Sequence, residues 1–555
     1  MFKPSHVAFA LIATTQAAHA QQLPSAGTQL QQLPQAPVIP QLQPELELGQ
    51  RPAPADIAEA GPSIRVTALE ITGQTVFSDA ELVAATGFTQ GGEYSLAQLR
   101  GLATRISEYY HARGYILAQA YLPAQDVQDG AVAIEVIEGR YGKIDLRNSA
   151  RLSDGVATRV LRGLTPGDLV TNAPLERRLL LLSDIPGVQA KATLAPGAEV
   201  GTSDLIVDVA PDRLITGSLE ADNAGSRYTG AYRFGGTINF NNPARYGDLL
   251  SVRVLTSDRG LAYGRAAYQA PFGNLTLGVA YAHLRYTLAR EFEALDGSGT
   301  ANIFSTYASY PLVRSRRGNL YALASADYKM LKDELEAVSS RSDRRVKAGT
   351  LGFAGDSRDT LLGGGANVFS AGWTTGQLRF RSPAERAIDA GTARSAGTYN
   401  KLQASIARLQ SITGRLSLYG AVRGQRAFDN LDSSEKIQLG GAYGVRAYPE
   451  GEAFGDTGYV ATAEMRLGLG GIPASLPGAF ELVGFVDTGE VRYAEDPWFI
   501  GSNHARRSGY GAGVNWSGPS GLIVKASYAR KLGTGPATSA PDRDGRFWFQ
   551  VVKLF

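Results

Sequence analysis

The side chains that most often carry out chemistry in proteins are sparse in this sequence. It contains no cysteine, and its five histidines, at positions 6, 19, 111, 283 and 504, have no HExxH or other metal-ligand spacing. Neither a Walker lysine motif nor a GxSxG nucleophile elbow is present. Glycines at 509, 511 and 513 recur at strand spacing, which favours close approach of the wall to a plug over phosphate binding. We therefore expect no enzyme, no metal and no cofactor.

Charged side chains are instead distributed through alternating segments of the C-terminal part. In the segment 232–240, one set alternates with another: Tyr232, Phe234, Gly236, Ile238 and Phe240 with Arg233, Gly235, Thr237 and Asn239. Because neighbouring side chains of a strand leave opposite faces, one face can meet lipid and the other a wet interior. The charged residues that this pattern assigns inward are Arg233, Arg253, Arg415, Arg423, Arg466, Lys525, Glu464, Glu481 and Asp487. Since a dry core would desolvate them, we expect a water-filled or loop-plugged interior.

These segments predict a transmembrane antiparallel β-barrel over residues 212–555. Their number is about 16, and an even number returns the C-terminus to the side of the N-terminal domains. Tight joints near 271–274, 413–414 and 518–520 alternate with long ones near 289–300, 382–397 and 490–506. Short periplasmic turns and longer outer loops are typical of outer-membrane barrels. Beyond residue 20 there is no run of about 18 uncharged apolar residues, the minimum for a spanning helix.

The N-terminal 63 residues predict export and a spacer. Residues 1–20 read as a signal peptide, with Lys3, an apolar stretch at 7–13 and the small-x-small site Ala18, His19, Ala20. Residues 21–63 are rich in Gln and Pro, and their prolines would interrupt a helix. We interpret them as a flexible linker, with a plug or a partner-binding arm as the alternative.

Two short α+β units of the order β-α-α-β-β follow, at residues 64–139 and 140–211. In the first, Ser78 and Glu81 form a capping box, a second helix covers about 95–113, and strands follow at 116–122 and 131–137. The second has the same order of elements, so the chain carries an internal repeat of about 75 residues. The fold class is therefore mainly β, with two α+β domains before the barrel.

One connection of the barrel is long and glycine-punctuated, between a strand ending near Phe428 and one starting near Gly458. It contains Val445, Arg446, Ala447 and Tyr448. Together with the two repeats and a barrel of about 16 strands, this motif resembles that of the two-partner secretion transporters, the haemolysin and filamentous haemagglutinin secretion and activation proteins. The repeats resemble their polypeptide-transport-associated (POTRA) domains. The family pattern is Val-Arg-Gly followed by Tyr or Phe, from which Ala447 departs.

The resemblance implies a site in the lumen. In that family the loop, the sixth outer one, folds back into the barrel and its arginine pairs with an acidic residue on the inner wall. Asp487 is the matching position, and alternation independently directs Phe485 and Asp487 inward. Glu464 also faces inward and can share the guanidinium. We expect Arg446→Ala to impair transport far more than Arg423→Ala, because a sheltered carboxylate would lose its partner.

The resemblance further implies a pore that exports, and in some members activates, a large exoprotein such as an adhesin or haemolysin. The alternatives are an assembly insertase of the same superfamily and a passive porin; the number of repeats favours the transporter. The expected location is the outer membrane of a Gram-negative bacterium, with the POTRA domains in the periplasm. The expected partners are the exoprotein, outer-membrane lipid and the barrel-assembly machinery, with no nucleic acid, and we expect a monomer.

Two further sets of residues are candidates for partner recognition. An exposed strand edge in the first POTRA domain would bind an extended exoprotein by β-augmentation, without ATP. The candidate edge is Ile116, Leu117, Ala118, Gln119, Ala120, Tyr121 and Leu122. At the other end of the chain, the aromatic stretch that finishes at Phe555 resembles the assembly signal of outer-membrane proteins.

Overall fold

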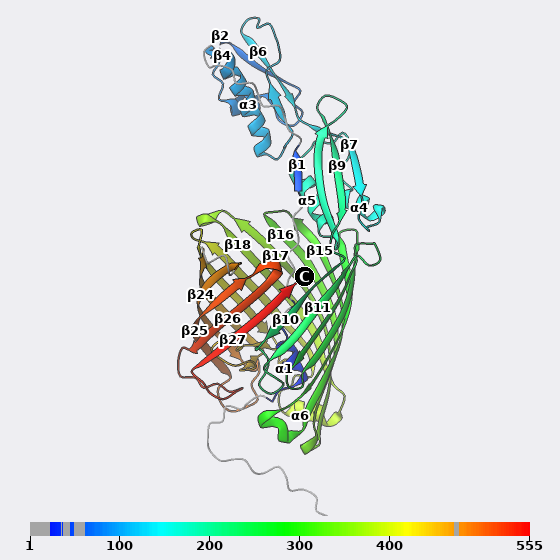
Figure 1. Ribbon diagram of the computed structural model, residues 1–555, viewed down its shortest axis with the longest axis vertical. Helices are drawn as coiled ribbons and strands as arrows, with labels where there is room; N and C mark the ends of the chain where they lie inside the picture. Colours follow the sequence, from blue (N-terminus) through cyan, green and yellow to red (C-terminus); the bar gives the residue numbers. More distant parts are fainter. Residues whose placement is uncertain (1–22, 35, 37–44, 49–61, 471–476) are drawn as a thin grey trace, which may run out of the picture.

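The computed structural model describes residues 23–34, 36, 45–48, 62–470 and 477–555. The predicted signal peptide and most of the predicted linker lie outside these residues. Figure 1 shows an elongated molecule in which two small α+β units stand on one end of a barrel. Among the described residues, no helix has the length and apolarity needed to cross a membrane.

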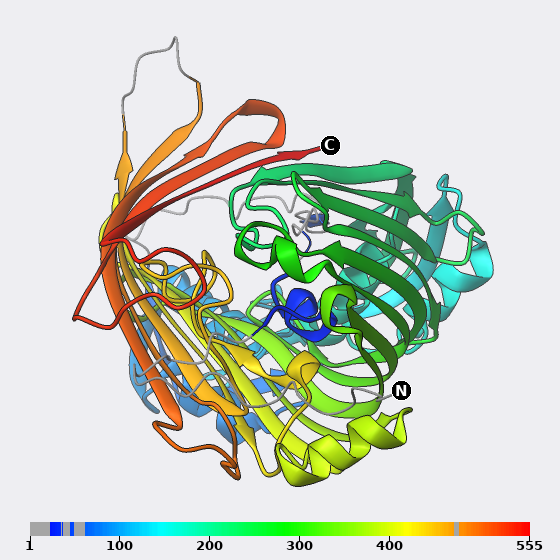
Figure 2. The same cartoon turned by 90° about the horizontal axis from the view of Figure 1, so that it is seen from below.

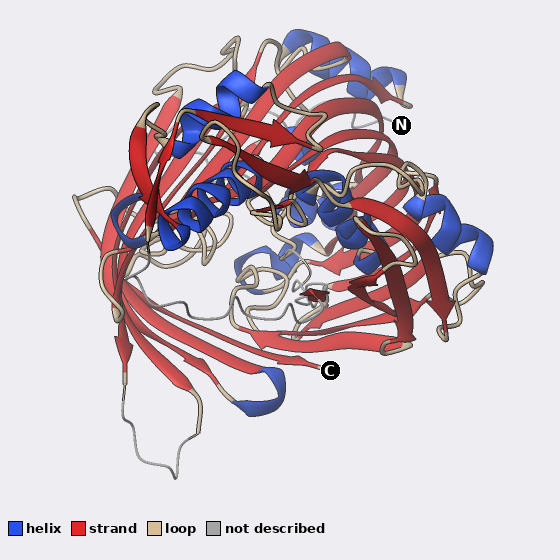
Figure 3. Ribbon diagram, turned by 90° about the horizontal axis from the view of Figure 1, so that it is seen from above, coloured by secondary structure: helices blue, strands red, loops and turns tan. Residues whose placement is uncertain are grey.

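Sixteen antiparallel strands form a closed barrel, so the predicted barrel is confirmed (Figure 3). Each strand is hydrogen-bonded to its neighbours along the chain, and β10 closes the ring with β27. The strands are β10 (Ile215–Asp222), β11 (Arg233–Asn241), β12 (Leu249–Ser257), β13 (Ala262–Phe272), β14 (Leu275–Thr287), β15 (Gly297–Arg314), β16 (Gly318–Leu335), β17 (Ser340–Asp359), β18 (Gly365–Phe380), β19 (Gly397–Ser411), β20 (Leu416–Ala427), β23 (Thr457–Leu469), β24 (Ala479–Arg492), β25 (His504–Ser517), β26 (Leu522–Lys531) and β27 (Gly545–Leu554).

The period-two pattern orients the wall as the sequence predicts. On β11, Phe234 and Ile238 are exposed on the outer face, whereas Arg233 is buried against Asp222 inside. The tight turn at 518–521 and Pro271 lie near the second α+β unit, and the long connections lie at the opposite end. Arg415 is an exception to the predicted inward set. It is exposed in the turn between β19 and β20, one residue before the strand begins, so the alternation does not apply to it.

The first α+β unit contains more strands than predicted. Its three-stranded sheet has the order β3-β6-β5, and β2 and β4 form a separate pair. Ser78 and Glu81 form the predicted capping box, and Gly87 ends that helix in the left-handed conformation. The elements are β2 (Ser63–Val66), β3 (Ala68–Thr72), α2 (Asp79–Thr86), β4 (Gly92–Ser95), α3 (Leu96–Ala112), β5 (Gln119–Tyr121) and β6 (Ala131–Ile137). The apolar face of α3, with Leu99, Leu102 and Ile106, covers this sheet.

The second unit has the predicted order of elements and one additional strand. Strand β1, from the predicted linker, pairs in parallel with β8, which gives the sheet order β1-β8-β9-β7. The elements are β1 (Glu45–Leu48), β7 (Arg140–Asn148), α4 (Asp154–Leu161), α5 (Asn172–Ser183), β8 (Val188–Pro196) and β9 (Thr202–Pro211). A core of Leu175, Leu179, Val207 and their neighbours joins the helices to the sheet.

Another part of the predicted linker is helical. Helix α1 (Ala26–Gln31) lies inside the barrel, as Figure 2 shows from the outer end. It occupies the proline-free interval between Pro24 and Pro34, and Ser25 caps it by accepting a hydrogen bond from the Thr28 amide. The linker is therefore more than a spacer: its first part fills lumen and a later part extends a sheet.

The connections at the outer end carry short elements of their own. At the end of the barrel next to the α+β units, η3 joins β17 to β18 and η5 joins β25 to β26. The remaining elements are η1 (Arg290–Leu295), η2 (Glu336–Val338), η3 (Leu361–Gly363), α6 (Pro383–Gly391), η4 (Ser433–Glu435), β21 (Ile437–Gln438), β22 (Phe454–Gly455) and η5 (Pro519–Gly521). Three of them, η4, β21 and β22, belong to the connection between β20 and β23, residues 428–456, which we call loop 6.

Candidate functional site in the barrel lumen

Loop 6 folds back into the barrel and carries Arg446 to the inner wall. Arg446 Nε and Nη2 each donate to a different oxygen of Asp487 at 2.8 Å, and the Arg446 amide donates to the same carboxylate at 3.2 Å. Arg446 Nη1 lies 2.9 Å from Glu464, on the neighbouring strand β23. The Asp487 side chain is fully buried and that of Glu464 is 9% exposed. The structure therefore brings together all three charged residues that the sequence suggested.

Aromatic side chains contact Arg446 in addition to these carboxylates. We call Arg446 with Asp487 and Glu464 the Arg446 clamp. The guanidinium carbon of Arg446 lies 3.4 Å from the ring centroid of Phe485, which stands on β24 two residues before Asp487. From β27, three strands further around the barrel, Trp548 donates its indole N–H to the Arg446 carbonyl at 2.7 Å. A planar cation between an aromatic face and a carboxylate is a contact that arginine makes and lysine does not reproduce. Trp548 has no signal in the sequence beyond its place in the final strand.

The methyl group of Ala447 fits because the wall opposite has no side chain. Ala447 is fully buried, and a Cβ placed on Gly509 would lie 2.4 Å from the Ala447 Cβ. Ala447 is absent from the described residues with a positive φ, so the backbone there does not require glycine. The departure from the family motif is thus accommodated by Gly509. The predicted role of Gly509 in close approach agrees with this contact, whereas Gly513 faces its neighbouring strand.

The two remaining motif residues fill the space around the clamp. Val445 is fully buried within loop 6, where its amide donates to the Leu439 carbonyl. Tyr448 is 1% exposed, and its hydroxyl donates to the Gly535 carbonyl in the last outer connection at 3.0 Å. The motif therefore joins loop 6 to two other regions: the wall at β24 and the connection between β26 and β27.

Loop 6 is also held by ion pairs that the sequence analysis did not identify. Glu435 lies 2.6 Å from Lys329 and 2.9 Å from Lys401, on β16 and β19. Asp432 pairs with Arg344 on β17 at 2.6 Å, and Glu452 pairs with Arg507 on β25 at 2.8 Å. These contacts surround the lumen, so the loop is fastened to many strands. The acidic residues of loop 6 stand in no recognisable motif, and no local sequence pattern predicts which basic residues they pair with.

Arg423 is one of the wall residues that bind loop 6. Its Nη2 donates to the Gln438 carbonyl at 3.2 Å and to the Tyr443 carbonyl at 3.3 Å. Arg423→Ala would therefore disturb the same loop as Arg446→Ala. A neutral control must come from a pair that is remote from loop 6.

Helix α1 is seated on loop 6 and on the wall. The Ala26 amide donates to Asp333 Oδ1 at 2.7 Å, and the Ser25 and Ser433 hydroxyls lie 3.0 Å apart. Gly27 packs so closely that a Cβ would lie 2.2 Å from the Ser433 hydroxyl oxygen. Arg344 pairs with both Asp333 and Asp432, and so links the seat of α1 to loop 6. The helix and the loop therefore form one connected unit inside the barrel.

The predicted recognition edge is shorter and more occupied than expected. Of residues 116–122, only Gln119–Tyr121 form strand β5, which does lie at the edge of its sheet. The Ala120 amide donates to the Ser107 hydroxyl at 2.8 Å, and a ring nitrogen of His111 lies 2.8 Å from the Ala118 carbonyl oxygen. Ile116 and Leu117 pack against the core of the second unit. Helix α3 thus occupies part of the backbone that an added strand would need.

Phe555 lies at the seam where the barrel closes. Its amide donates to the Gly217 carbonyl at 3.1 Å, and the Gly217 amide donates to the Phe555 carbonyl at 2.9 Å. A Cβ on Gly217 would lie 2.6 Å from the Phe555 ring, so the ring lies directly over that glycine. Phe555 therefore has a structural contact in addition to its predicted part in assembly.

Comparison with known proteins gives matches over the whole architecture. The model of the family described as haemolysin secretion/activation protein ShlB/FhaC/HecB matches residues 201–516. The model of the POTRA domain, ShlB-type, matches residues 64–139.

Individual relatives match over most of their length. The heme/hemopexin transporter protein HuxB of Haemophilus influenzae (strain 86-028NP) is 26% identical over 96% of this chain and 95% of its own. The outer membrane transporter CdiB of Dickeya dadantii (strain 3937) is 24% identical, over 81% of this chain and 82% of its own. Among solved structures, CdiB from Escherichia coli superposes with a TM-score of 0.69 at 20% identity, covering 92% of this chain and 94% of its own. The last likeness is one of fold.

Proposed function

The chain belongs to the haemolysin secretion/activation family, ShlB/FhaC/HecB, and on this basis we propose that it exports one large partner protein through its barrel. It is an outer-membrane transporter of two-partner secretion, with its α+β units on the periplasmic side. The observation that carries the proposal is the Arg446 clamp, which holds loop 6 inside a closed barrel of sixteen strands below two periplasmic units.

We propose the following division of labour along the chain. Residues 1–20 direct export, residues 21–63 link and plug, residues 64–139 and 140–211 are POTRA domains, and residues 212–555 are the pore. The exoprotein is an adhesin or haemolysin in this proposal, and the transporter acts as a monomer without a catalytic step or a cofactor. The plugging role of the linker is supported by the contacts of α1 with Asp333 and Ser433.

A test separates this function from the two alternatives. Deleting the gene for this protein in its host should stop secretion of one large, signal-bearing exoprotein. Other outer-membrane proteins should stay at their usual levels. General loss of outer-membrane proteins would indicate an insertase. Loss of small-solute uptake with normal secretion would indicate a porin.

The periplasmic units are the proposed receptors for the unfolded exoprotein. Because α3 occupies part of the β5 edge, the first unit offers fewer free backbone groups at 116–122 than an open edge would. Deleting residues 64–139 should abolish secretion while the barrel still inserts. Normal secretion by that deletion would contradict recognition by the first unit.

Forward movement in this proposal comes from folding of the partner outside the cell. The sequence has no Walker motif, and a folded exoprotein cannot return through a narrow pore. An exoprotein variant that cannot fold should therefore leave the cell more slowly. Its export at the normal rate would contradict this source of direction.

A further inference from the structure

A group of cations lies on the lipid-facing side of the barrel, at the outer end of β14 to β18. Inward and outward positions follow from burial: Leu331, Val346 and Leu378 are buried inside, so their sequence neighbours face outward. The outward cations are Arg285, Lys332, Arg345, Lys347 and Arg379. A lumenal role is therefore excluded for them.

The strand register places these cations side by side. Arg345 on β17 lies opposite Arg379 on β18, and Lys347 is two residues further along β17. Lys332 lies across from Asp343, an outward carboxylate, and Glu334, two residues further along the same face of β16, pairs with Arg341. Asp343 is 3.8 Å from Arg345 and 3.7 Å from Arg381. Within the part of the chain that the structure describes, Arg285, Lys332, Lys347 and Arg379 have no ion-pair partner.

A row of aromatic residues lies level with Lys347 and immediately below the other cations. Tyr281, Phe304 and Tyr328 are consecutive partners in the register, and Lys347 continues the same row. Lys347 Nζ lies 5.9 Å from the Tyr328 ring centroid, and Arg345 donates to the Tyr328 hydroxyl at 2.8 Å. Aromatic rows of this kind mark the level of the lipid headgroups on outer-membrane barrels. The cations therefore stand at headgroup level on the outer side.

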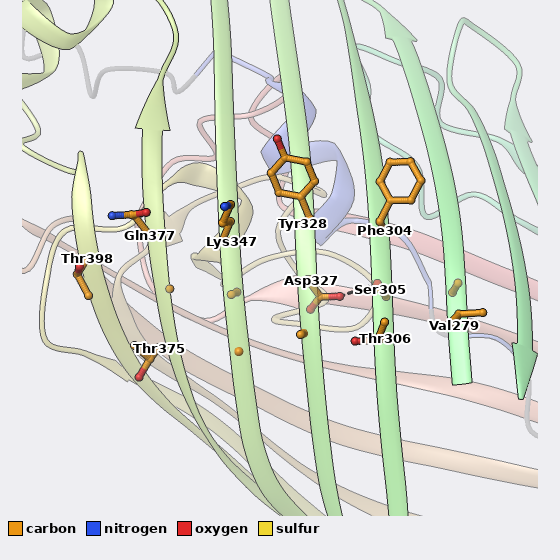
Figure 4. A pocket seen from close by; sticks show the side chains of 15 residues that line it. Val279, Phe304, Ser305, Thr306, Asp327, Tyr328, Lys347, Thr375, Gln377 and Thr398 are labelled. Carbon is orange, nitrogen blue, oxygen red and sulfur yellow. Dashed lines mark hydrogen bonds between the residues drawn. The ribbon is translucent and has the colours of Figure 1, made fainter. Parts of the chain in front are cut away.

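Below this row the outer wall is hollowed. A hollow of about 800 Å³ is lined by Phe304, Tyr328, Lys347 and Gln377, which Figure 4 shows on four neighbouring strands. A second hollow of about 610 Å³ continues it toward the periplasmic side, where Phe272 and Leu277 line it. The two hollows share Val279, Thr306 and Ala326, and we call them together the furrow.

The floor of this furrow consists of small residues. Thr306 and Ala308 on β15, Ala324 and Ala326 on β16 and Gly349 on β17 line it. From Phe304 to Ala308 the strand advances about 14 Å. That length is comparable with the roughly 15 Å of hydrocarbon in one leaflet of a membrane. A shallow groove of small residues of this length, with cations at its upper end, matches one acyl chain and its headgroup in length.

We propose that this surface is a specific binding site for the phosphorylated glycolipid of the outer leaflet. Its phosphates would bind Arg345, Lys347 and Arg379, and an acyl chain would lie in the furrow over Gly349. Cations near a membrane surface attract anionic headgroups, and the furrow adds apolar burial. The outer face of β20 to β25 differs, since Arg492 and Arg426 there share Glu495, and Arg506 lies across from Glu490.

The test measures lipid binding to the purified, delipidated full-length protein by native mass spectrometry. The probes are bisphosphorylated lipid A, dephosphorylated lipid A and phosphatidylglycerol. Bisphosphorylated lipid A should form a one-to-one complex. The double variant Lys347→Gln, Arg379→Gln should weaken it at least about tenfold. This readout is independent of secretion.

Two further variants keep the test decisive. Gly349→Leu fills the furrow without changing charge, and the wall has room for it because a Cβ there meets nothing closer than the Thr375 carbonyl oxygen at 4.0 Å. It should weaken binding as well. Arg506→Gln, an exposed outward cation on β25, is the control and should bind normally.

Three results would overturn the proposal. One is equal binding of dephosphorylated lipid A, and another is an equal loss in Arg506→Gln. The third is phosphatidylglycerol binding as tightly as bisphosphorylated lipid A, which would assign the site to a glycerophospholipid.

Discussion

Arg446 uses the geometry of a guanidinium rather than its charge alone. It bonds both oxygens of Asp487, approaches Glu464 and lies on the ring of Phe485. An ammonium group cannot make these contacts together. Arg446→Lys should therefore reduce secretion nearly as much as Arg446→Ala, whose loss of a buried partner is worth about 3 to 5 kcal/mol. Secretion of the partner and protease cleavage within loop 6 measure both variants.

The control for this experiment is Arg408→Ala. Arg408 pairs bidentately with Asp359 at the periplasmic end, where both side chains are about one-third exposed. An ion pair this open to water contributes little to stability, so secretion should remain normal. Wild-type secretion by Arg446→Lys would show that charge alone holds the loop.

The contact between Ala447 and Gly509 predicts a compensating pair of substitutions. Gly509→Ala would force two methyl groups into one space and destabilise the closed loop by about 1 to 3 kcal/mol. Ala447→Gly in the same chain removes the methyl–methyl clash and leaves a 3.0 Å contact with the Arg530 carbonyl oxygen, so it should restore most of the lost stability. The unfolding temperature in detergent and the rate of secretion measure the three variants. If the double variant is as impaired as Gly509→Ala alone, the contact does not explain the departure from the motif.

At the scale of elements, the fit of α1, the proposed plug, depends on one glycine. In Gly27→Ala the new methyl group would lie about as close as 2.2 Å to the Ser433 hydroxyl oxygen, so the helix should leave its seat more often. Planar-bilayer conductance should then rise above that of the native protein. Gly264→Ala on β13, where a Cβ meets no atom within 4 Å, should leave conductance unchanged. Equal conductance of both variants would indicate that α1 does not close the pore.

The first periplasmic unit depends on a buried carboxylate. Glu138 accepts hydrogen bonds from the Thr75 and Val76 amides at 2.7 and 2.9 Å and from the Tyr110 hydroxyl at 2.9 Å. Burial raises the pKa of Glu138, but the hydrogen bonds from Thr75, Val76 and Tyr110 outweigh it and hold the pKa below its ordinary value of 4.5. Because the folded pKa is the lower one, this stabilisation is present above the ordinary pKa and disappears as pH falls through the folded value.

Glu138→Gln should accordingly destabilise this unit at neutral pH by about 1 to 3 kcal/mol. The stability of the variant should also change less as the pH is lowered. Hydrogen exchange of α3 and β6 in the full chain, at neutral and acidic pH, measures this. Glu108→Gln on the exposed side of α3 is the matched control. A native pH dependence in Glu138→Gln would contradict the assignment.

Regular elements were predictable because their patterns are local. The capping box at Ser78, the apolar face of α3 and the alternation of the barrel strands each lie within a few residues of sequence. The pairing of Arg446 with Asp487 followed from a family motif together with alternation. The contacts of α1 and the partners of Glu435 could not be predicted in this way. They join residues more than 30 positions apart, as from Lys401 to Glu435. Helix α1 was also missed, because the many prolines of the linker predicted no helix although none lies between Pro24 and Pro34.

At the scale of the whole molecule, the barrel is joined unevenly around its circumference. Strands β16 and β17 pair over their whole common length, from Gly318 to Leu335, whereas β10 and β27 pair only from Ser218 to Asp222. Loop 6 and α1 connect opposite parts of the wall from inside, through Arg344, Lys401 and Arg507. Loop 6 and α1 therefore join separate strands of the barrel from inside, and their release should loosen the cylinder.

The short seam makes Phe555 a residue with two separable roles. Deleting it removes both backbone hydrogen bonds to Gly217, whereas Phe555→Ala keeps them and removes only the ring. In protein refolded in detergent, the deletion should lower the unfolding temperature and Phe555→Ala should lower it less, because each lost bond contributes about 1 kcal/mol. In cells, both variants should reduce the amount of folded barrel, measured by its heat-modifiable migration, if the aromatic ring is read by the assembly machinery. A normal cellular level of Phe555→Ala would leave Phe555 with the structural role alone.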